Sequence, residues 1–446
     1  MNHPGIPHHA RTVIALSTLA ATLVAAPSLR ADLAAYVKAP DETTRWKVER
    51  TSDIPGGGSA TLVHLVSQTW QGEPWEHWLG LIRPPTVTHP KHCLLVISGG
   101  SRRKEPPNPL GREGLILTEV ARRLETVVAV LPQVPNQPLF DGLKEDALIA
   151  HTFVKYLETG DATWPCLLPM TKSAVKAMDA IQAVAREKHS QAIESFIVTG
   201  GSKRGWTTWL TAAVDGRVAA IAPMVIDTLN MSKQMALQRL SFGGYSEEIQ
   251  DYTSRNLPER MAEPGAKRLL DIVDPYAYLA RLSMPKLIVL GTNDRYWPVD
   301  AVKLYFGDLP GEKHIHYVPN KGHGLGVEAV EAVTAFTQAV IAGDPRPAIT
   351  WRTDRDGDAV VLSIESPEKP EAADLWRAEA PTRDFREAKW TSAPAAADGE
   401  RRFTGKFNLP AKGFAAFFGR LTFKTRASVL AVSTNVEVLG DAEKAP

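Results

Sequence analysis

Residues 196–206 read Phe-Ile-Val-Thr-Gly-Gly-Ser-Lys-Arg-Gly-Trp, and this stretch carries the strongest structural signal in the chain. A short apolar run leads into Gly200, a serine follows at position 202, and a helical pattern begins directly after it. This is the context of a nucleophile elbow, a strained turn that presents a serine hydroxyl at the edge of a sheet. Two positions after Ser202 stands Arg204, however, and the next glycine comes one residue later, at Gly205. Two other interpretations remain open: a serine in an ordinary β–α turn, and a phosphate-binding loop, although the spacing typical of such loops is missing.

A serine hydroxyl is a poor nucleophile near neutral pH and needs a base that a third group orients. Asp294 follows the apolar run 287–290, and His323 lies between two glycines after the strand-like run 314–318. The order serine, acid, histidine is the one found when the serine lies on a strand–turn–helix elbow. We therefore predict Ser202 as nucleophile, Asp294 as acid and His323 as base. Asp227, which also follows a strand-like run, is the alternative acid.

Cleavage at a carbonyl also requires hydrogen-bond donors for the developing oxyanion. The backbone N–H of Lys203, directly after the serine, is the first candidate. The second donor should come from the loop after an early strand, and Ile-Ser-Gly-Gly-Ser at residues 97–101 lies at such a place. We predict the amide of Gly100 or of Ser101, and the sequence does not choose between them.

Basic and aromatic residues flank these two loops. Arg102 begins a run of three cations after the oxyanion loop, and Arg204 follows the nucleophile. If both loops line one opening, their cations favour an anionic ester or peptide as substrate. The other interpretation is that Arg204 pairs inside the protein with a carboxylate such as Asp141 or Asp146. Two aromatic side chains are further candidates for substrate binding, although core packing explains them equally well: Trp206 and Trp297.

The rest of the chain alternates short apolar runs with amphipathic helical patterns, which predicts a parallel sheet covered by helices. We assign this domain to residues 32–342. Residues 230–282 hold no clear strand pattern, so we expect a helical cap over the carboxyl edge of the sheet. Gly-Asp-Pro-Arg-Pro at 343–347 is typical of a linker, and the alternating runs within residues 348–439 predict a small β-sandwich.

The chain has 446 residues, with 51 Lys and Arg against 50 Asp and Glu, which gives a net charge of +1. Hydrophobic residues make up 44% and charged residues 23%, values that exclude wholesale disorder and coiled-coil architecture. Nucleic-acid-binding proteins usually carry a strong basic excess, so we expect no nucleic-acid partner. We find no convincing set of metal ligands and no dinucleotide fingerprint, and we predict neither a metal nor another cofactor. The two cysteines, Cys93 and Cys166, could form one disulfide or remain two separate thiols.

The first 31 residues differ from the rest of the chain. Arg11 precedes an uncharged apolar run at residues 12–26, which is too short to span a bilayer, and small residues follow it. This pattern is typical of a secretory signal peptide, here residues 1–31 with cleavage after Ala31. No later run approaches the length of a transmembrane helix. We therefore expect an exported protein, periplasmic or secreted, with no stable membrane insertion after the signal is removed.

Five motifs along the chain are distinctive: Ile-Ser-Gly-Gly at 97–100, Thr-Gly-Asp-Ala-Thr-Trp-Pro at 159–165, Leu-Pro-Met at 168–170, Gly-Gly-Ser-Lys-Arg-Gly-Trp at 200–206 and Gly-Thr-Asn-Asp at 291–294. They resemble those of the PhoPQ-activated pathogenicity-related protein family, which has an α/β-hydrolase fold. The resemblance extends from about residue 36 to residue 439 and implies an α/β-hydrolase domain, a C-terminal β domain and secretion. The Ser-Lys-Arg-Gly pattern is also similar to that of glucuronoyl esterases, a more distant kinship.

The elbow, the order of the triad residues and the resemblance together predict a secreted serine hydrolase that works through an acyl-enzyme. An ester substrate is favoured over an amide, on a small molecule or a polymer. Two alternatives stay open. One is a secreted serine peptidase. The other is a non-catalytic binding or signalling protein, because some eukaryotic relatives are regarded as secreted proliferation regulators.

Overall fold

The computed structural model describes residue 1 and residues 32–108, 111–425 and 429–440. The predicted signal peptide, apart from residue 1, lies outside these residues. The central feature is a mixed sheet with the strand order β1-β2-β3-β5-β4-β6-β7-β8-β9. Strands β5, β4, β6, β7, β8 and β9 run parallel, and β1, β2 and β3 form an antiparallel set that joins them at β5. The strands are β1 (Arg45–Asp53), β2 (Ser59–Trp70), β3 (Glu73–Arg83), β4 (His92–Ile97), β5 (Val127–Leu131), β6 (Ser195–Gly201), β7 (Val218–Met224), β8 (Lys286–Gly291) and β9 (Lys313–Val318).

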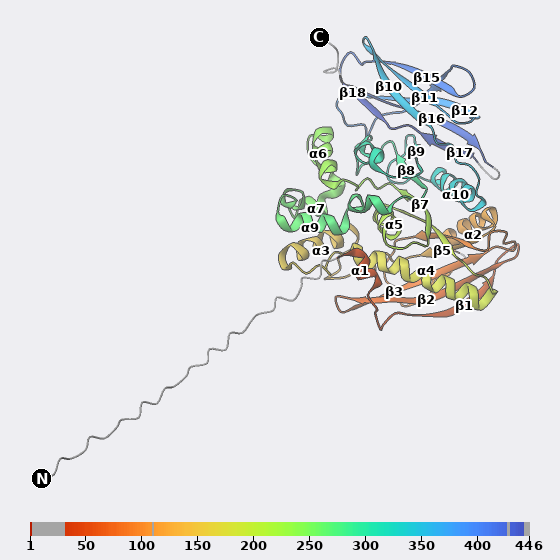
Figure 1. Ribbon diagram of the computed structural model, residues 1–446, viewed down its shortest axis with the longest axis vertical. Coiled ribbons are helices and arrows are strands. Elements are labelled where there is room, and N and C mark those ends of the chain that lie inside the picture. Colours follow the sequence, from red (N-terminus) through yellow and green to blue (C-terminus); the bar gives the residue numbers. More distant parts are fainter. Residues whose placement is uncertain (2–31, 109–110, 426–428, 441–446) are drawn as a thin grey trace. The chain divides into compact units, whose positions relative to one another are not determined.

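The parallel strands are apolar on both faces because helices cover both sides of the sheet (Figure 1). Every residue of β8 is buried, and alternate residues of β4 and β5 belong to two different core clusters. One cluster includes α1, α4 and α5, and the other includes α2 and α10. This arrangement confirms the predicted α/β-hydrolase fold. The helices are α1 (Leu33–Lys38), α2 (Arg112–Leu124), α3 (Glu145–Thr159), α4 (Leu167–His189), α5 (Lys203–Val214) and α10 (Val327–Ala342).

The segment between β7 and β8 is helical and packs beside α3, as Figure 1 shows for α7 and α9. The buried carboxylate of Asp274 fastens both ends of this insertion. It accepts the backbone N–H groups of Asn230 and Met231 at the start of the insertion and of Tyr276 near its end. The elements of the insertion are α6 (Met231–Phe242), η1 (Glu247–Ile249), α7 (Gln250–Thr253), α8 (Leu257–Arg260), α9 (Pro264–Val273) and η2 (Pro275–Arg281), and two short 3₁₀ helices follow β8, η3 (Ala301–Leu304) and η4 (Phe306–Asp308).

The C-terminal part consists of antiparallel strands in two layers. Strands β10, β11, β15 and β14 form one sheet, and its Phe407 stacks on Phe417 of the other layer with ring centroids 4.0 Å apart. The second layer is β17-β16-β12-β13, with β18 also on β16, and it extends the central sheet because Ser433 of β17 pairs with Ile315 of β9. The strands are β10 (Thr350–Asp356), β11 (Ala359–Glu365), β12 (Ala372–Ala380), β13 (Thr391–Pro394), β14 (Ala396–Ala397), β15 (Arg402–Asn408), β16 (Phe414–Lys424), β17 (Val429–Ser433) and β18 (Glu437–Gly440).

The two cysteines are separate thiols. Cys93 on β4 and Cys166 at the start of α4 are both buried and unbonded. Burial raises the pKa of each thiol above its ordinary value, so neither is a reactive thiolate near neutral pH.

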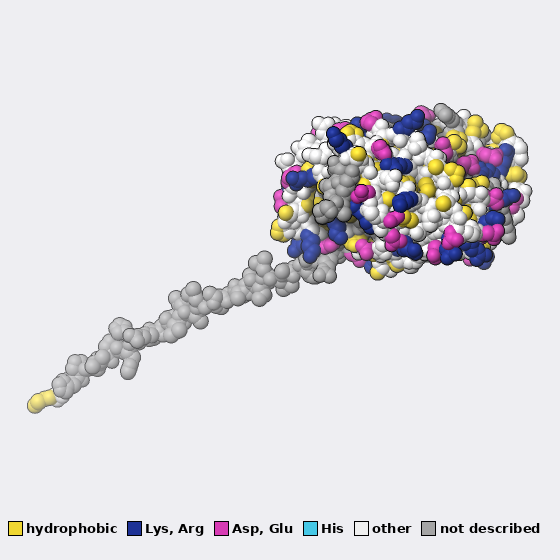
Figure 2. Space-filling model, turned by 90° about the horizontal axis from the view of Figure 1, so that it is seen from above, with side chains coloured by type: hydrophobic (Ala, Val, Ile, Leu, Met, Phe, Trp, Pro, Cys, Tyr) yellow, Lys and Arg dark blue, Asp and Glu magenta, His cyan; other side chains and the backbone are white. Residues whose placement is uncertain are grey.

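The surface carries charges of both signs. In the face shown in Figure 2, Lys and Arg side chains alternate with Asp and Glu side chains. Among the described residues, no helix is both long and apolar enough to cross a membrane.

Candidate active site

Ser202 stands on the turn between β6 and α5. Its φ of 57° and ψ of −127° lie outside the regions that non-glycine residues normally adopt, which marks a strained turn. The neighbouring glycines give strand and helix room to cross. A Cβ on Gly200 would lie 2.8 Å from backbone atoms of Arg204, and a Cβ on Gly205 would lie 3.0 Å from the carbonyl oxygen of Gly200. The glycine three positions after the serine therefore allows the close approach that this motif usually obtains two positions after it.

Asp294 and His323 meet at the carboxyl edge of the sheet, in the loops after β8 and β9. The Nδ1 atom of His323 lies 2.9 Å and 3.1 Å from the two carboxylate oxygens of Asp294. Asp294 is only 7% exposed, and the backbone N–H of Tyr296 donates to its Oδ1 atom. This contact assigns the proton of the imidazole to Nδ1, which leaves Nε2 as an acceptor.

Nε2 of His323 is buried and has no hydrogen-bond partner among the described residues. The hydroxyl of Ser202 likewise makes no hydrogen bond to a described residue, and hydrogen bonds of this kind often form only when substrate is bound. Tyr296 lies near both residues. Its ring lies against the His323 ring, with centroids 4.3 Å apart, and it lines the same pocket as Ser202.

Two asparagines, which the sequence interpretation missed, hold the acid and base loops. The side-chain amide of Asn293 donates to the carbonyls of Phe385, Arg386 and Ala388, the last at 2.7 Å. Asn320 exchanges two hydrogen bonds with the backbone of Trp390. All four partners lie in the connection between β12 and β13. This connection in the C-terminal part of the chain therefore helps to fix the loops of Asp294 and His323. An asparagine near a glycine is such a common turn signal that the sequence alone does not reveal this role.

The alternative acid, Asp227, has a different partner. It is buried, and the hydroxyl of Tyr305 donates to its carboxylate at 2.5 Å. Burial raises the pKa of Asp227 to about 7, which disfavours a permanently charged carboxylate at this position. No hydrogen bond joins it to His323 within the described part of the chain, so the geometry favours Asp294 as the partner of the histidine.

The predicted oxyanion donors fall in two places. Lys203 is the first residue of α5, and its N–H therefore lacks a partner within the helix. Gly100 and Ser101 line a second cavity, beside β2, β3 and α2, that Ser202 does not line. The guanidinium of Arg204 packs against the start of this loop and would be 2.5 Å from a Cβ on Gly99. The structure therefore brings Lys203 to the serine but does not bring Gly100 or Ser101 into the same pocket.

The two cations next to the nucleophile are paired with carboxylates inside the protein. The guanidinium of Arg204 pairs with both carboxylate oxygens of Glu145 at 2.8 Å and 2.6 Å, and Nζ of Lys203 lies 2.6 Å from Asp146. Glu145 and Asp146 begin α3, and the sequence pattern gave no sign that this helix end would meet the elbow. The expected internal pairing of Arg204 is thus present, with Glu145 as its partner instead of Asp141 or Asp146.

Arg102 is also occupied by protein groups. Its guanidinium donates to Glu73 at 3.0 Å, to the Asn136 side chain at 2.7 Å and to the carbonyl of Pro74. Neither Arg102 nor Arg204 lines the pocket beside Ser202. A direct role for these two arginines in substrate binding therefore finds no support in the structure.

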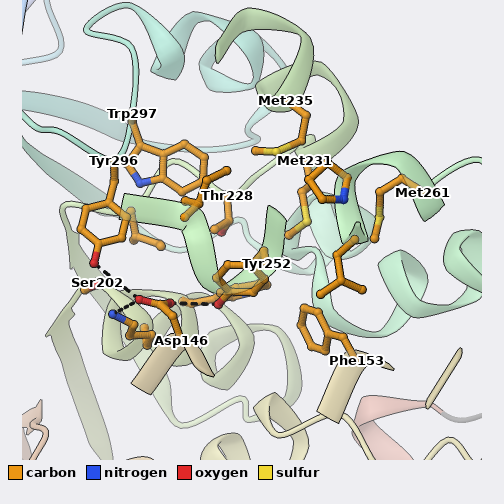
Figure 3. A pocket seen from close by; sticks show the side chains of 16 residues that line it. Asp146, Phe153, Ser202, Thr228, Met231, Met235, Tyr252, Met261, Tyr296 and Trp297 are labelled. Atoms are coloured by element: carbon orange, nitrogen blue, oxygen red, sulfur yellow. Dashed lines mark hydrogen bonds and ion pairs between the residues drawn. The ribbon is translucent and has the colours of Figure 1, made fainter. Parts of the chain in front are cut away.

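A pocket beside Ser202 lies between α3, α5, the inserted helices and the loop after β8 (Figure 3). It encloses about 700 Å³ when its open end is included. Trp206 and Trp297, both predicted to bind substrate, line it. Trp206 is also anchored, because its indole N–H donates to the carbonyl of Val273. Among the described residues, no group of three or more His, Cys, Asp or Glu side chains has the arrangement of a metal site.

The chain is similar to several known proteins. The chain is 32% identical over 398 residues to autocrine proliferation repressor protein A of Dictyostelium discoideum, an alignment that covers 84% of this chain and 78% of that protein. Among solved structures, acetyl xylan esterase 1 from Thermoanaerobacterium sp. is similar with a TM-score of 0.47 and 15% identity, covering 67% of this chain and 88% of that one. A glucuronoyl esterase from Solibacter usitatus gives a TM-score of 0.44 and 14% identity, covering 69% of this chain and 90% of that one. The profile of the PhoPQ-activated pathogenicity-related protein family matches residues 33–386. The chain therefore belongs to the family of PhoPQ-activated pathogenicity-related proteins.

Proposed function

We propose that the protein is a serine hydrolase that cleaves carboxylic esters through an acyl-enzyme on Ser202. The main support is the state of His323, whose Nδ1 is held by the buried carboxylate of Asp294 while its Nε2 lacks a partner among the described residues. A histidine held in this way is prepared to accept a proton. Ser202 supplies the nucleophile from its strained turn. It lines the same pocket as Tyr296, whose ring lies against the ring of His323.

In the proposed reaction, Oγ of Ser202 attacks the ester carbonyl and Nε2 of His323 accepts the hydroxyl proton. The carbonyl oxygen, which becomes negatively charged, accepts a hydrogen bond from the backbone N–H of Lys203. Collapse of the intermediate expels the alcohol, which takes the proton from His323 and leaves the acyl group on Ser202. Water then attacks the acyl-enzyme, giving its proton to His323, and Ser202 regains a proton as the carboxylic acid leaves. Asp294 stabilises the imidazolium in both halves.

Hydrolysis of p-nitrophenyl acetate and butyrate tests the proposal. Ser202→Ala should lower kcat by at least about 1,000-fold, because the acyl-enzyme cannot form. Ser232→Ala, at an exposed position of α6, should leave kcat within about twofold and serves as the matched control. Retained turnover in folded Ser202→Ala would contradict the proposal. Aminoacyl anilides in the same assay separate ester hydrolysis from peptidase activity.

The anionic ester or peptide suggested by the basic loops loses the support of three of their cations. Lys203 and Arg204 are paired with Asp146 and Glu145, and Arg102 is paired with Glu73. An anionic substrate would have to compete with these carboxylates for the same cations.

We also propose that the protein is exported, on the strength of Arg11 and the uncharged run at residues 12–26. Protein recovered from the periplasm or the medium should begin near Asp32 when its first residues are sequenced. Recovery only from the cytoplasm, with Met1 or residue 2 at the N-terminus, would refute export.

A secreted signalling role is the second candidate, because the relative with 32% identity is named an autocrine proliferation repressor. A protein that acts only by binding needs no paired Asp294 and His323, and this pair therefore favours the enzyme. If the folded wild-type chain hydrolyses none of the esters or anilides tested, the signalling role becomes the better explanation.

A further inference from the structure

The pocket beside Ser202 has one polar end and one apolar end. In Figure 3, Ser202, Asp146 and Tyr296 lie at one end, and Met231, Met261 and Phe153 lie at the other. An ester bond held at Ser202 would therefore direct one of its substituents toward the apolar end. Methionine side chains are flexible and polarisable, so they can pack around apolar groups of several shapes.

The two charged groups of the pocket neutralise each other. Nζ of Lys203 lies 2.6 Å from Oδ2 of Asp146, and the hydroxyls of Tyr252 and Tyr296 also donate to this carboxylate. Asp146 is 8% exposed and Lys203 is 8% exposed. Among the described residues of the lining no charge remains uncompensated, so a charged substituent would enter the pocket without a counterion and at a large desolvation cost.

Two polar atoms of the lining have no hydrogen-bond partner in the described part of the chain. Oγ1 of Thr228 and Nε1 of Trp297 are buried without a hydrogen bond to any described residue, in side chains that are 2% and 7% exposed. Buried polar atoms of this kind normally find a partner, and an indole N–H can only donate. A ligand atom that accepts a hydrogen bond could satisfy either of these two groups.

We infer that this pocket binds the acyl group of the substrate, and that this group is uncharged, apolar, longer than acetyl, and carries one hydrogen-bond acceptor. The inference rests on the proposed function of Ser202. It names a substrate class that differs from the anionic esters suggested by the sequence, because here the selection comes from the inserted helices and not from the basic loops.

A series of p-nitrophenyl esters tests the length of the acyl group. Burial of each additional methylene group should strengthen binding of the transition state about fourfold. The hexanoate should therefore have a kcat/KM at least about tenfold higher than that of the acetate. Met235→Glu, at a half-buried pocket position of α6, should lower kcat/KM for the hexanoate at least about tenfold and for the acetate less than about threefold. Leu240→Glu is the matched control, since Leu240 lies on the same helix, is 67% exposed and is not part of the pocket.

Thr228→Val tests the acceptor, because valine has nearly the same shape and lacks the hydroxyl. The variant should lower kcat/KM for the 4-oxopentanoyl ester by about five- to tenfold relative to its effect on the pentanoyl ester. An equal effect of Thr228→Val on kcat/KM for both esters would contradict the proposed hydrogen-bond acceptor in the acyl group. Two results would contradict binding of the acyl group in this pocket, provided that Ser202-dependent turnover persists. One is a kcat/KM that does not change with acyl length, and the other is an equal loss of kcat/KM for the acetate and the hexanoate in Met235→Glu. Failure of the proposed function is a different result, namely the absence of Ser202-dependent turnover for every ester.

Discussion

Asp294→Asn is expected to lower kcat for ester hydrolysis by about 1,000- to 10,000-fold without unfolding the protein. The Oδ1 atom of the asparagine can still accept the N–H of Tyr296, so the loop keeps one of its contacts. Its amide N–H₂ group, however, can donate to Nδ1 of His323 and thereby move the imidazole proton to Nε2. The histidine then cannot accept the proton of Ser202. The measurement is kcat for p-nitrophenyl acetate, with the midpoint of thermal unfolding recorded in parallel.

Asp227→Asn is the matched control, since it neutralises another buried carboxylate at the same edge of the sheet. Its carboxylate accepts from Tyr305, and the amide oxygen of asparagine can accept the same hydrogen bond. We expect kcat to stay within about threefold of the wild type. A large loss in Asp227→Asn together with near-normal turnover in Asp294→Asn would reverse the assignment of the acid.

Gly205→Ala should both destabilise the protein and impair turnover. The added Cβ would lie 2.6 Å from Cγ2 of Ile226 and 3.0 Å from the carbonyl oxygens of Gly200 and Met224, and backbone atoms cannot swing away as a flexible side chain can. Overpacking of this kind costs about 1–3 kcal/mol of the free energy of unfolding. Because α5 would shift relative to β6, Ser202 would move from its position, and a displacement near 1 Å lowers kcat by about 100-fold.

Gly216→Ala provides the comparison for this variant. Gly216 follows the same helix, and a Cβ there would have no heavy atom within 4 Å. We expect an unfolding free energy within about 1 kcal/mol of the wild type and normal kcat. The two variants are compared by chemical denaturation and by ester hydrolysis. Equal behaviour would show that the close crossing at Gly205 is unimportant.

The sequence predicted the parts of the fold that depend on local pattern. Parallel strands buried on both faces produce continuous apolar runs, and for that reason β6 and β8 can be predicted from the sequence. The strand–turn–helix at Ser202 is equally local. Its departure from the usual glycine spacing could not be interpreted from sequence, because the distance from Gly205 to the carbonyl of Gly200 exists only once strand and helix have crossed.

The remaining features arise from contacts between segments far apart in the chain. Glu145 and Asp146 neutralise cations nearly sixty residues away, and only the placement of α3 beside α5 brings them together. The same holds for Asn293, which bonds to backbone atoms more than ninety residues further on. The sequence pattern of the C-terminal strands predicted a β-sandwich, but the pairing of β17 with β9 depends on how two sheet edges meet. The pairing of Glu145 and Asp146 with Arg204 and Lys203 changed the expected substrate from an anionic to an uncharged ester.

Labelling with a fluorophosphonate tests the nucleophilic role of Ser202 most directly, since this reagent reacts with an activated serine and needs no knowledge of the natural substrate. The folded wild-type protein should gain the mass of one adduct, and the modified peptide should contain Ser202. Ser202→Ala and His323→Ala, folded as judged by their unfolding transitions, should remain unlabelled under the same conditions. No adduct on the folded wild-type chain, or an adduct on another residue that persists in Ser202→Ala, would contradict the proposed catalytic site.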